Sequence, residues 1–292
     1  MSGPQVYLDG QFLPLCEARV PVEDRGFLFG DGVYEVLRAS AGRLWAEEAH
    51  WRGLAASCRD VALSLPDGLT GEGLHGLVSE LLGRNGLSGA EATVYLQLTR
   101  GAAPRTHHFP PPGTRPTLYL SASPFTPPWE AREQGVQAIT QPDVRSLCCH
   151  IKSINLLPNI LAKQRAKEAG ATEAVLVREG VITEGASTSV LAVIGGAVCT
   201  HPDGPFILPG ITRDVVLALA RDAGLPVSER PVRLEERGRF EELFLASTTL
   251  DVVPVVALDG LPIGAGRPGP VTRALQRAFY RARGVVPPRL LG

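Results

Sequence analysis

The sequence predicts a two-domain protein of the α/β (α+β) class, with a small α/β N-terminal domain and a larger β-rich C-terminal domain that also contains helices. Strand-like and helix-like hydrophobic patterns alternate in the first part, and short strands separated by glycine turns dominate the second. A proline-rich stretch, which can continue neither a helix nor a central strand, lies between them. We therefore expect domains at residues 1–122 and 130–292, joined by a linker at 123–129.

The composition is that of a soluble globular protein that acts on small molecules. Its 292 residues are 44% hydrophobic and 20% charged, which provides for a substantial core. The formal net charge is −1 and the basic residues are scattered, so we expect no nucleic-acid partner and no binding to an acidic membrane surface. The opening MSGPQVYLDGQFLP lacks a basic leader with an apolar core, and no apolar run is long enough to span a bilayer, which predicts a cytoplasmic protein.

Cysteine and histidine spacing gives no sign of disulfides or of a metal site. The five cysteines form no CxxC pair, and their odd number argues against a disulfide framework, so we expect them to be reduced. The neighbouring His107 and His108 have no companion cysteine or carboxylate at ligand spacing. We therefore predict no bound metal.

The first domain is expected to begin with a hairpin and to contain two helices. Asp9-Gly10 is a two-residue turn signal between two apolar strands. Apolar residues at helical spacing predict the helices, and alternating apolar residues predict the later strands. The expected elements are strands Gln5–Leu8 and Gln11–Leu13, helices Ala46–Leu63 and Gly71–Leu82, and strands Ala92–Leu98 and Thr117–Ser121.

The second domain is expected to contain a meander of β-hairpins between two helices. Glu179-Gly180 and Gly195-Gly196 are turn signals between short apolar runs, and Gly170 and Gly224 follow helical patterns, where glycine commonly ends a helix. This order of elements is not a Rossmann pattern. The expected elements are strands Val136–Thr140, Glu173–Arg178, Val181–Thr183, Ser189–Ile194, Ala197–Thr200 and Leu243–Leu245, helices Pro158–Ala169 and Thr212–Ala223, and a solvated loop and helix face at Glu229–Glu242.

Lys152 is the first candidate catalytic residue, because it lies between an apolar approach and a helix that begins near Pro158. A lysine attacks carbonyl groups only when it is neutral, so its pKa must fall from about 10.4 to roughly 7–8 through desolvation or a nearby cation. Glu184, in a later Thr-Glu-Gly turn, would suit an enzyme with a lysine-bound aldehyde cofactor, in which an acidic residue keeps a pyridine nitrogen protonated. Taken alone, such a lysine is most often a solvated surface charge.

Two clusters could hold a phosphate group. Ile211 and Thr212 follow Leu208-Pro209-Gly210 and open a helix, whose first N–H groups have no partner within the helix and attract anions. The alternative is that Thr212 merely caps its own helix. Ser247 and Thr248 offer hydroxyl donors directly after an apolar strand, and two such clusters would suit one phosphate.

Taken in order, these residues resemble those of the fold-type IV pyridoxal phosphate enzymes, a family that includes branched-chain and D-amino acid aminotransferases and aminodeoxychorismate lyase. The resemblance spans nearly the whole chain and is greatest to the D-amino acid transaminases. It implies a two-domain fold with a barrel-like second domain, and pyridoxal 5′-phosphate (PLP) as cofactor. The segments that carry it are EDRGFLFGDGVYEV (Glu23–Val36), TRGAAPRTHHFP (Thr99–Pro110), IKSINLL (Ile151–Leu157) and LPGITRDVV (Leu208–Val216).

The resemblance implies a role for each candidate around the cofactor. Lys152 would be the Schiff-base lysine and proton shuttle, Glu184 would contact the pyridine nitrogen, and Leu208 would pack against the ring. The residues expected to hold the phosphate are Ile211, Thr212, Ser247 and Thr248.

The same resemblance assigns Tyr34, Arg105 and His107 to the α-carboxylate of the substrate. A guanidinium can bind two carboxylate oxygens, while a phenol and an imidazole complete the shell. Taken singly, the three would be a strand residue, a surface charge and a turn residue. Their PRTHHFP context favours the binding role.

Two positions depart from the family pattern. Relatives carry HxxR in the helix after the first strands, with the arginine at the cofactor phosphate, whereas this chain has His50-Trp51-Arg52-Gly53. A shift of one position rotates a helical side chain by about 100°, so Arg52 would reach the phosphate only if the helix is offset or bulged. Relatives also typically carry asparagine near position 189, where this chain has Ser189.

The predicted activity is ping-pong transamination from a D-amino acid such as D-alanine to an oxo acid such as 2-oxoglutarate. A branched-chain L-amino acid aminotransferase, an (R)-amine transaminase and an aminodeoxychorismate lyase share the scaffold and remain alternatives, as does a weakly catalytic PLP-binding protein. Arg105 and His107 favour the D-enzyme. Relatives are generally dimers, so the resemblance also implies a homodimer.

Overall fold

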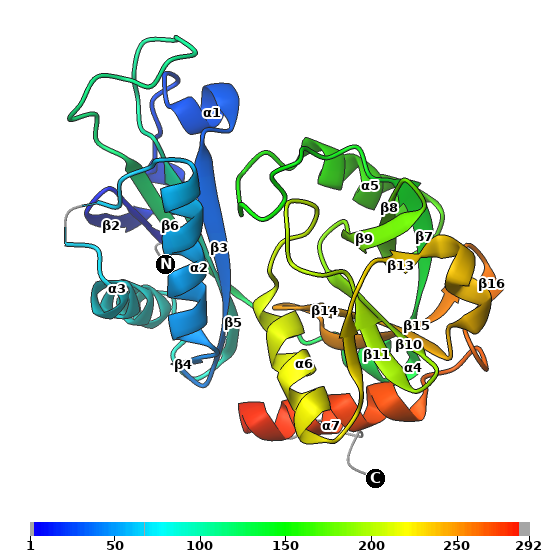
Figure 1. Cartoon of the computed structure of the whole chain (residues 1–292). Helices are drawn as coiled ribbons and strands as arrows, with labels where there is room; N and C mark the ends of the chain where they lie inside the picture. Colours follow the sequence, from blue (N-terminus) through cyan, green and yellow to red (C-terminus); the bar gives the residue numbers. More distant parts are fainter. Residues whose placement is uncertain (1–2, 67, 286–292) are drawn as a thin grey trace. The chain divides into compact units, whose positions relative to one another are not determined.

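The computed structural model describes residues 3–66 and 68–285, which form two compact units (Figure 1). The first unit contains the chain up to Thr126 together with Ile151–Asn155, and the second contains Pro127–His150 and the chain from Leu156 onward. The chain therefore passes between the units at 126/127, 150/151 and 155/156. The sequence analysis assigned Lys152 to the second domain, whereas the contacts of its segment are with the first unit.

The first unit contains a six-stranded antiparallel sheet. Its elements are β1 (Gln5–Leu8), β2 (Gln11–Pro14), a 3₁₀ turn (Leu15–Glu17), α1 (Arg25–Phe29), β3 (Gly32–Ser40), β4 (Arg43–Leu44), α2 (Glu47–Asp60), α3 (Gly71–Arg84), β5 (Glu91–Thr99) and β6 (Thr117–Pro124). The strands lie in the order β2-β1-β6-β5-β3-β4. The predicted hairpin is confirmed, and both turn residues have positive φ, 48° at Asp9 and 98° at Gly10, as a type I′ turn requires.

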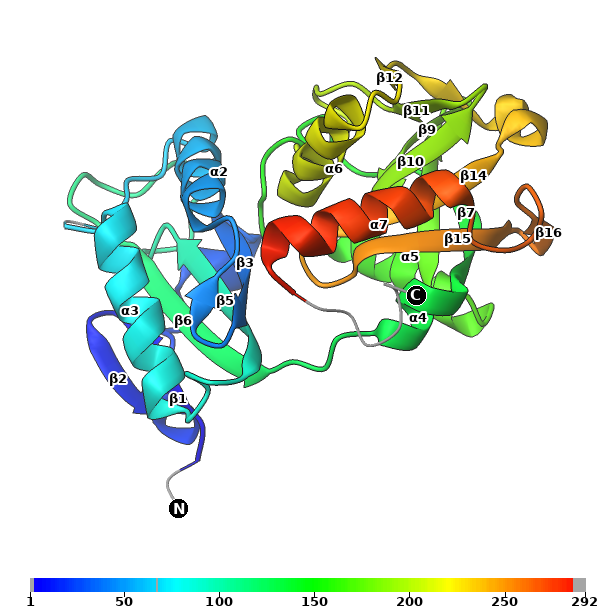
Figure 2. The ribbon, with the colours of Figure 1, turned by 90° about the horizontal axis from the view of Figure 1, so that it is seen from below.

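Helices α2 and α3 pack on the sheet of the first unit and bury its main apolar cluster (Figures 1 and 2). Leu54 and Cys58 of α2, and Leu74 and Val78 of α3, are spaced four residues apart, so each pair lies on one face of its helix. The apolar residues that predicted these helices from their spacing are thus residues that the helices bury against the sheet. Helix α2 ends at Asp60, three residues before the predicted Leu63.

The connection between the units is shorter than the predicted linker. Strand β6 continues through Ser123 and Pro124, which pair with Thr93 and Ala92 of β5. A short helix, α4 (Trp129–Gln134), then begins the second unit. Proline is tolerated at Pro124 because this residue is the last of its strand.

The second unit contains a curled, half-barrel sheet of ten strands (Figure 1). Its strands are β7 (Val136–Pro142), β8 (Glu173–Arg178), β9 (Val181–Gly185), β10 (Ser189–Ile194), β11 (Ala197–Thr200), β12 (Val227–Glu229), β13 (Val232–Arg233), β14 (Glu242–Ser247), β15 (Asp251–Leu258) and β16 (Leu261–Pro262). They lie in the order β12-β11-β10-β14-β15-β7-β8-β9-β13, and β16 pairs with β15. The sheet is mixed, because β7 runs parallel to both β15 and β8, and β11 runs parallel to β12.

Three longer helices cover this sheet: α5 (Leu157–Glu168), α6 (Ile211–Asp222) and α7 (Pro270–Arg283). Alternate residues of a strand point to opposite faces, so Leu243 and Leu245 of β14 join the interior cluster while Phe244 between them is buried on the other face. Helices α6 and α7 pack on β14, and they lie against each other (Figure 2). Ala162 and Ala166 attach α5 to β8.

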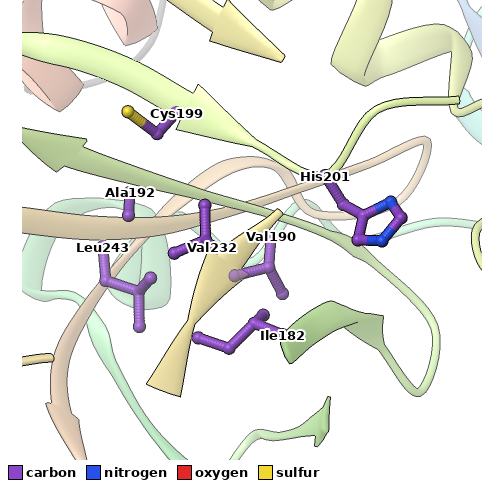
Figure 3. Close-up of a pocket in the computed structure, with 7 residues that line it drawn as sticks. All are labelled: Ile182, Val190, Ala192, Cys199, His201, Val232 and Leu243. Carbon is purple, nitrogen blue, oxygen red and sulfur yellow. The ribbon is translucent and has the colours of Figure 1, made fainter. Parts of the chain in front are cut away.

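The interior of the half-barrel is a packed core. Figure 3 shows seven side chains that line a narrow pocket in this unit, among them Cys199 and the ring of His201. The lining is almost wholly apolar and leaves no room for a water molecule. This interior therefore leaves no space for a ligand.

Candidate cofactor and substrate site

Glu184 lies near the end of β9, where its carboxylate is buried and has two kinds of partner. Nη1 of Arg145 donates to Oε1 of Glu184 and forms an ion pair with it. The backbone N–H of Leu208 donates to both carboxylate oxygens, at 3.2 Å each. Burial raises the pKa of Glu184 to about 7, although Arg145 and the Leu208 N–H lower it.

Arg145 is fixed by a second carboxylate, that of Asp143. Nε and Nη2 of Arg145 donate to the two oxygens of Asp143, each at 2.9 Å, and Nη2 also donates to the carbonyl of Phe206 at 3.0 Å. Burial alone would raise the pKa of Asp143, but the hydrogen bonds and charge of Arg145 hold it at about 2. The Thr183 hydroxyl also donates to Asp143, at 2.9 Å. Glu184 therefore belongs to a buried, rigidly held network.

The sequence analysis identified Glu184 but not Arg145 or Asp143. A single arginine and a single aspartate after strand β7 carry no local signal, since each is usually a surface charge. Only the pairing of β8 with both β7 and β9 brings these residues beside Thr183 and Glu184.

The N-terminus of α6 forms the first of the two predicted phosphate clusters. The first helical hydrogen bond runs from the Asp214 N–H to the Gly210 carbonyl at 2.9 Å, so the N–H groups of Ile211 and Thr212 precede the helical ladder. Gly210 is the N-cap and has no side chain to satisfy them. The helix begins at Ile211, one residue earlier than predicted, so Thr212 lies inside it and the alternative that Thr212 caps α6 is wrong.

Gly210 itself is a close-packed position. A Cβ atom added there would lie 2.6 Å from Oγ of Ser189, a distance that side-chain atoms do not tolerate. The absence of a side chain at Gly210 makes room for the Ser189 hydroxyl beside the N-terminus of α6. An anion such as phosphate is the ligand that such a helix end attracts.

The second predicted cluster, Ser247 and Thr248, follows directly on β14. Ser247 is the last residue of the strand, and its hydroxyl accepts a hydrogen bond from the Leu250 N–H at 3.1 Å, which leaves its own proton available to a ligand. The β10–β14 pairing sets Ser189 opposite Ala246. Since Ser189 also lies against Gly210, it connects the two clusters.

Leu208 lies between the Glu184 carboxylate and the N-terminus of α6. Its N–H bonds to Glu184, and it precedes the Gly210 N-cap by two residues. Its side chain is half-buried. The predicted residues of the second unit therefore gather at one end of its sheet.

Lys152 belongs to the first unit, where backbone hydrogen bonds fix its position. Its N–H donates to the Ser57 hydroxyl at 3.1 Å, and its carbonyl accepts from the Tyr34 N–H at 3.0 Å. Its Nζ lies 4.3 Å from the centre of the Tyr34 ring. Within residues 3–66 and 68–285 no carboxylate forms an ion pair with Lys152.

Arg105 and His107 form a different cluster of the first unit, around Phe29. Cζ of Arg105 lies 5.0 Å from the centre of the Phe29 ring, and the centres of the His107 and Phe29 rings are 5.8 Å apart. Both side chains are exposed. Arg25 anchors their loop by donating to the Thr106 carbonyl at 2.8 Å. Among the described contacts none joins this cluster to Tyr34 or Lys152.

Arg52 occupies the solvent-facing side of α2. Its side chain is 65% exposed and pairs with Glu48 at 2.5 Å, one helical turn earlier. His50, two residues before it, is buried and bonds to Glu35 at 2.8 Å. The helix has neither the offset nor the bulge that would turn Arg52 inward, because residues 47–60 are regular α-helix.

The described residues form neither a metal site nor a membrane-spanning helix. In the part of the chain that the structure describes, no group of three or more His, Cys, Asp or Glu side chains is arranged to hold a metal ion. None of the described helices is both long enough and apolar enough to cross a bilayer.

Comparison with known proteins identifies the family. A D-alanine aminotransferase from Staphylococcus haemolyticus is 41% identical to this chain over 277 residues, which cover 95% of this chain and 97% of that protein. The branched-chain amino acid aminotransferase of Escherichia coli matches the structure with a TM-score of 0.86 at 26% identity, covering 96% of this chain and 94% of that one. A T.th. branched-chain amino acid aminotransferase, solved with pyridoxamine 5′-phosphate, matches with a TM-score of 0.85 at 26% identity, covering 98% and 96%.

The family model for class IV amino-transferases matches residues 32–258. This range runs from β3 of the first unit to the end of β15 in the second, so the match covers strands of both units. The chain therefore belongs to the class IV aminotransferase family.

Proposed function

We propose that the protein is a PLP-dependent D-amino acid transaminase, which moves the amino group of D-alanine or a similar D-amino acid to an oxo acid such as 2-oxoglutarate. The observation that carries this proposal is the arrangement at one end of the second sheet, where Leu208 joins the buried Glu184 carboxylate to the open N-terminus of α6. The 41% identity to a D-alanine aminotransferase supports the D-specific activity.

The residues present fit PLP. A buried carboxylate with its own arginine partner suits a protonated pyridine nitrogen, and a helix end that a Cβ atom would obstruct suits a phosphate. When bound, PLP supplies an electron sink for the α-carbon of the substrate. In this proposal Ile211, Thr212, Ser247 and Thr248 hold the phosphate, and Arg52 is left out because its exposed guanidinium is paired with Glu48.

The proposal gives Lys152 two tasks, to hold the cofactor and to move a proton. Its Nζ takes the α-proton from the amino acid and then gives it up to the carbon atom that carries the transferred amino group. The face of the Tyr34 ring, 4.3 Å from this nitrogen, limits the directions in which the amine can point. Restricting the orientation of a proton-transfer group is a common source of rate and of stereospecificity.

Tyr34, Arg105 and His107 are proposed to bind the substrate carboxylate. Arg105 is suited to this task because it is exposed and no carboxylate of the described residues pairs with it. Since the α-carboxylate and α-amino group are fixed at two points, the side on which the carboxylate binds decides which enantiomer presents its α-hydrogen to Lys152.

A branched-chain L-amino acid aminotransferase is the second candidate, because solved branched-chain amino acid aminotransferases match the structure with TM-scores of 0.86 and 0.85. Their identity to this chain is 26%, against 41% for the D-alanine aminotransferase. Proteins that share a fold can act on different substrates, so the similarity of fold does not decide between the two activities. The higher sequence identity to the D-alanine aminotransferase favours the D-specific assignment.

The test is a half-reaction. The purified protein, loaded with PLP, is mixed separately with D-alanine, L-leucine and (R)-1-phenylethylamine, and the visible absorbance of the bound cofactor is followed. We expect D-alanine alone to convert the spectrum to that of pyridoxamine phosphate. Lys152→Ala is expected to abolish turnover, and near-normal turnover by this variant would contradict the assignment. Conversion by L-leucine would establish the second candidate instead.

We also propose that the protein is a cytoplasmic homodimer. Leu157, Ile160 and Leu161 of α5 are 65%, 60% and 51% exposed, and their i, i+3, i+4 spacing forms an apolar stripe on one helix face. Such a stripe is typical of a subunit contact. All five cysteines are free, which agrees with a reducing compartment.

A further inference from the structure

Ser189, the first residue of β10, is largely buried, although its hydroxyl oxygen is not fully shielded from solvent. The residue is 8% exposed, and its Oγ forms no hydrogen bond with any residue that the structure describes. A largely buried hydroxyl without a hydrogen-bond partner is unfavourable. Such a group is expected to meet a ligand or an ordered water.

The hydroxyl of Ser189 points toward the N-terminus of α6. A Cβ atom added to Gly210, the N-cap of that helix, would lie 2.6 Å from Oγ of Ser189. The preceding residue, Thr188, faces the other way, because a Cβ atom added to Gly185 would lie 2.1 Å from its Oγ1. This alternation is that of a strand. It singles out Ser189 as the residue of this turn that faces the helix end.

The sheet register also places Ser189 at the end of β14, with its side chain on the face of Ala246 and not on the face of Ser247. Ser189 pairs with Ala246, the residue before Ser247, in the antiparallel β10–β14 ladder. A hydroxyl that borders both the α6 N-terminus and the end of β14 is in the right place to bind an anion held between them.

Uncharged hydrogen-bond donors are important for anion binding at the N-terminus of α6, because the first turn offers no unpaired cationic side chain among the described residues. Arg213 is the one cationic residue of the described first turn of α6, and its buried guanidinium already pairs with Asp203, Asp214 and Glu229. Within this turn, the phosphate must therefore be held by backbone N–H groups, the helix dipole and hydroxyls.

We propose that Ser189 is a further phosphate ligand of the cofactor, donating its Oγ proton to a phosphate oxygen between α6 and β14. The inference rests on the proposed function, since the phosphate is that of PLP. It adds to the predicted phosphate residues one that the sequence comparison alone marked only as a departure from the family pattern.

The test compares PLP with pyridoxal, which has the same ring but no phosphate. Dissociation constants for both are measured on the full-length apoprotein of wild type, Ser189→Ala and Ser187→Ala by fluorescence titration. Ser187 is the matched control, because it is two residues away, is exposed and bonds to Glu173 instead. A hydrogen bond to a charged group corresponds to roughly a 10- to 100-fold change in affinity.

We expect Ser189→Ala to weaken PLP binding by about that factor while pyridoxal binding and the melting temperature of the apoprotein stay unchanged. Inorganic phosphate should compete with PLP less well in this variant than in wild type, and Ser187→Ala should behave as wild type. Equal losses for PLP and pyridoxal, or no loss for either, would overturn the inference and leave the proposed function intact. If wild type itself does not bind PLP, the proposed function fails and the inference with it.

Discussion

At the scale of single residues, Glu184 shows how burial and charge are balanced before the cofactor binds. Burial raises its pKa to about 7, so the folded protein holds this proton more tightly than the unfolded chain does. A protonated pyridine ring beside the carboxylate would favour the ionised form. We therefore expect Glu184 to lose its proton when the cofactor binds, with Arg145 as the standing counter-charge.

The first prediction concerns the pH dependence of apoprotein stability. Between pH 4.5, the ordinary pKa of glutamate, and about 7 the folded state binds more protons at Glu184 than the unfolded state does. Stability falls with rising pH in such a window. Compared with Glu184→Gln, the wild-type apoprotein should lose roughly 3 kcal/mol of unfolding free energy between pH 4.5 and 8, since one pKa unit corresponds to about 1.4 kcal/mol.

The measurement is urea unfolding of both apoproteins across this pH range, with the difference plotted against pH. Groups other than Glu184 titrate in both proteins and cancel in the difference. Removing the charge partner of Arg145 adds an offset that does not vary with pH. Two parallel pH profiles would show that the Glu184 carboxylate is already ionised in the apoprotein.

Residues of the site differ in how far the sequence alone could predict them. Lys152, Glu184 and Thr212 occur in short contiguous motifs, so they were recognisable without any contact information. Arg145 was not, because its place beside Glu184 follows from strand pairings and from a hydrogen bond to the Phe206 carbonyl. Arg52 could be judged only once α2 was seen to be regular, which points it to solvent.

At the scale of elements, helix α7 depends on a carboxylate from a neighbouring strand. Glu242 of β14 accepts hydrogen bonds from the N–H groups of Val271 and Thr272 at 2.8 and 2.7 Å, and from the Thr272 hydroxyl at 2.6 Å. Gly269, the N-cap, has no side chain of its own, and a Cβ atom there would lie 2.1 Å from the Glu242 carboxyl carbon. A strand residue thus performs the capping that a helix usually obtains locally.

The second prediction is that Glu242→Ala destabilises the protein by about 3 kcal/mol, because it removes three charge-assisted hydrogen bonds and a favourable interaction with the helix dipole. Glu242→Gln keeps one acceptor oxygen and should lose about half as much. Glu241→Ala is the control, since this exposed neighbour should change stability by less than about 0.5 kcal/mol. Urea unfolding at neutral pH measures all three, and equal effects at 241 and 242 would refute the capping role.

A regular period of burial made several elements predictable, but the elements β15 and α7 were missed. Helix α3 and strand β8 were recovered because their apolar residues repeat at helical or strand spacing. Strand β15 was missed because Pro254 interrupts it, yet this proline lies just before the β7 ladder begins at Val255. Helix α7 was missed although Pro270 at its start and the Leu275 and Phe279 spacing are helix signals.

At the scale of the whole molecule, the path of the chain differs from a simple linear division into domains. Residues 151–155 return to the first unit, where Ser153 forms a β-bridge with Val33 of β3. The sequence shows the proline-rich boundary near residue 126, because proline marks it locally. It does not show the later return, since a backbone pairing between residues so far apart leaves no pattern in either segment.

The apolar stripe on α5 gives a reason for this chain to associate. The opposite side of the helix is already used, with Ala162 and Ala166 packed on β8, so Leu157, Ile160 and Leu161 are left facing outward. Leaving three large apolar side chains in water is unfavourable by roughly 1.5–3 kcal/mol each compared with burial. A symmetric contact would bury the stripe of both copies at once.

The third prediction is that wild type sediments as a dimer and that the double change Ile160→Glu and Leu161→Glu gives a monomer at micromolar concentration. Four buried carboxylates across a two-fold contact would be strongly unfavourable. Leu261→Glu is the matched control, because Leu261 is 58% exposed on β16, far along the chain from α5, and should leave the dimer intact. Sedimentation velocity decides among the outcomes. A double variant that remains dimeric with wild-type circular dichroism would show that the subunits meet elsewhere, and the exposed stripe would then need another occupant.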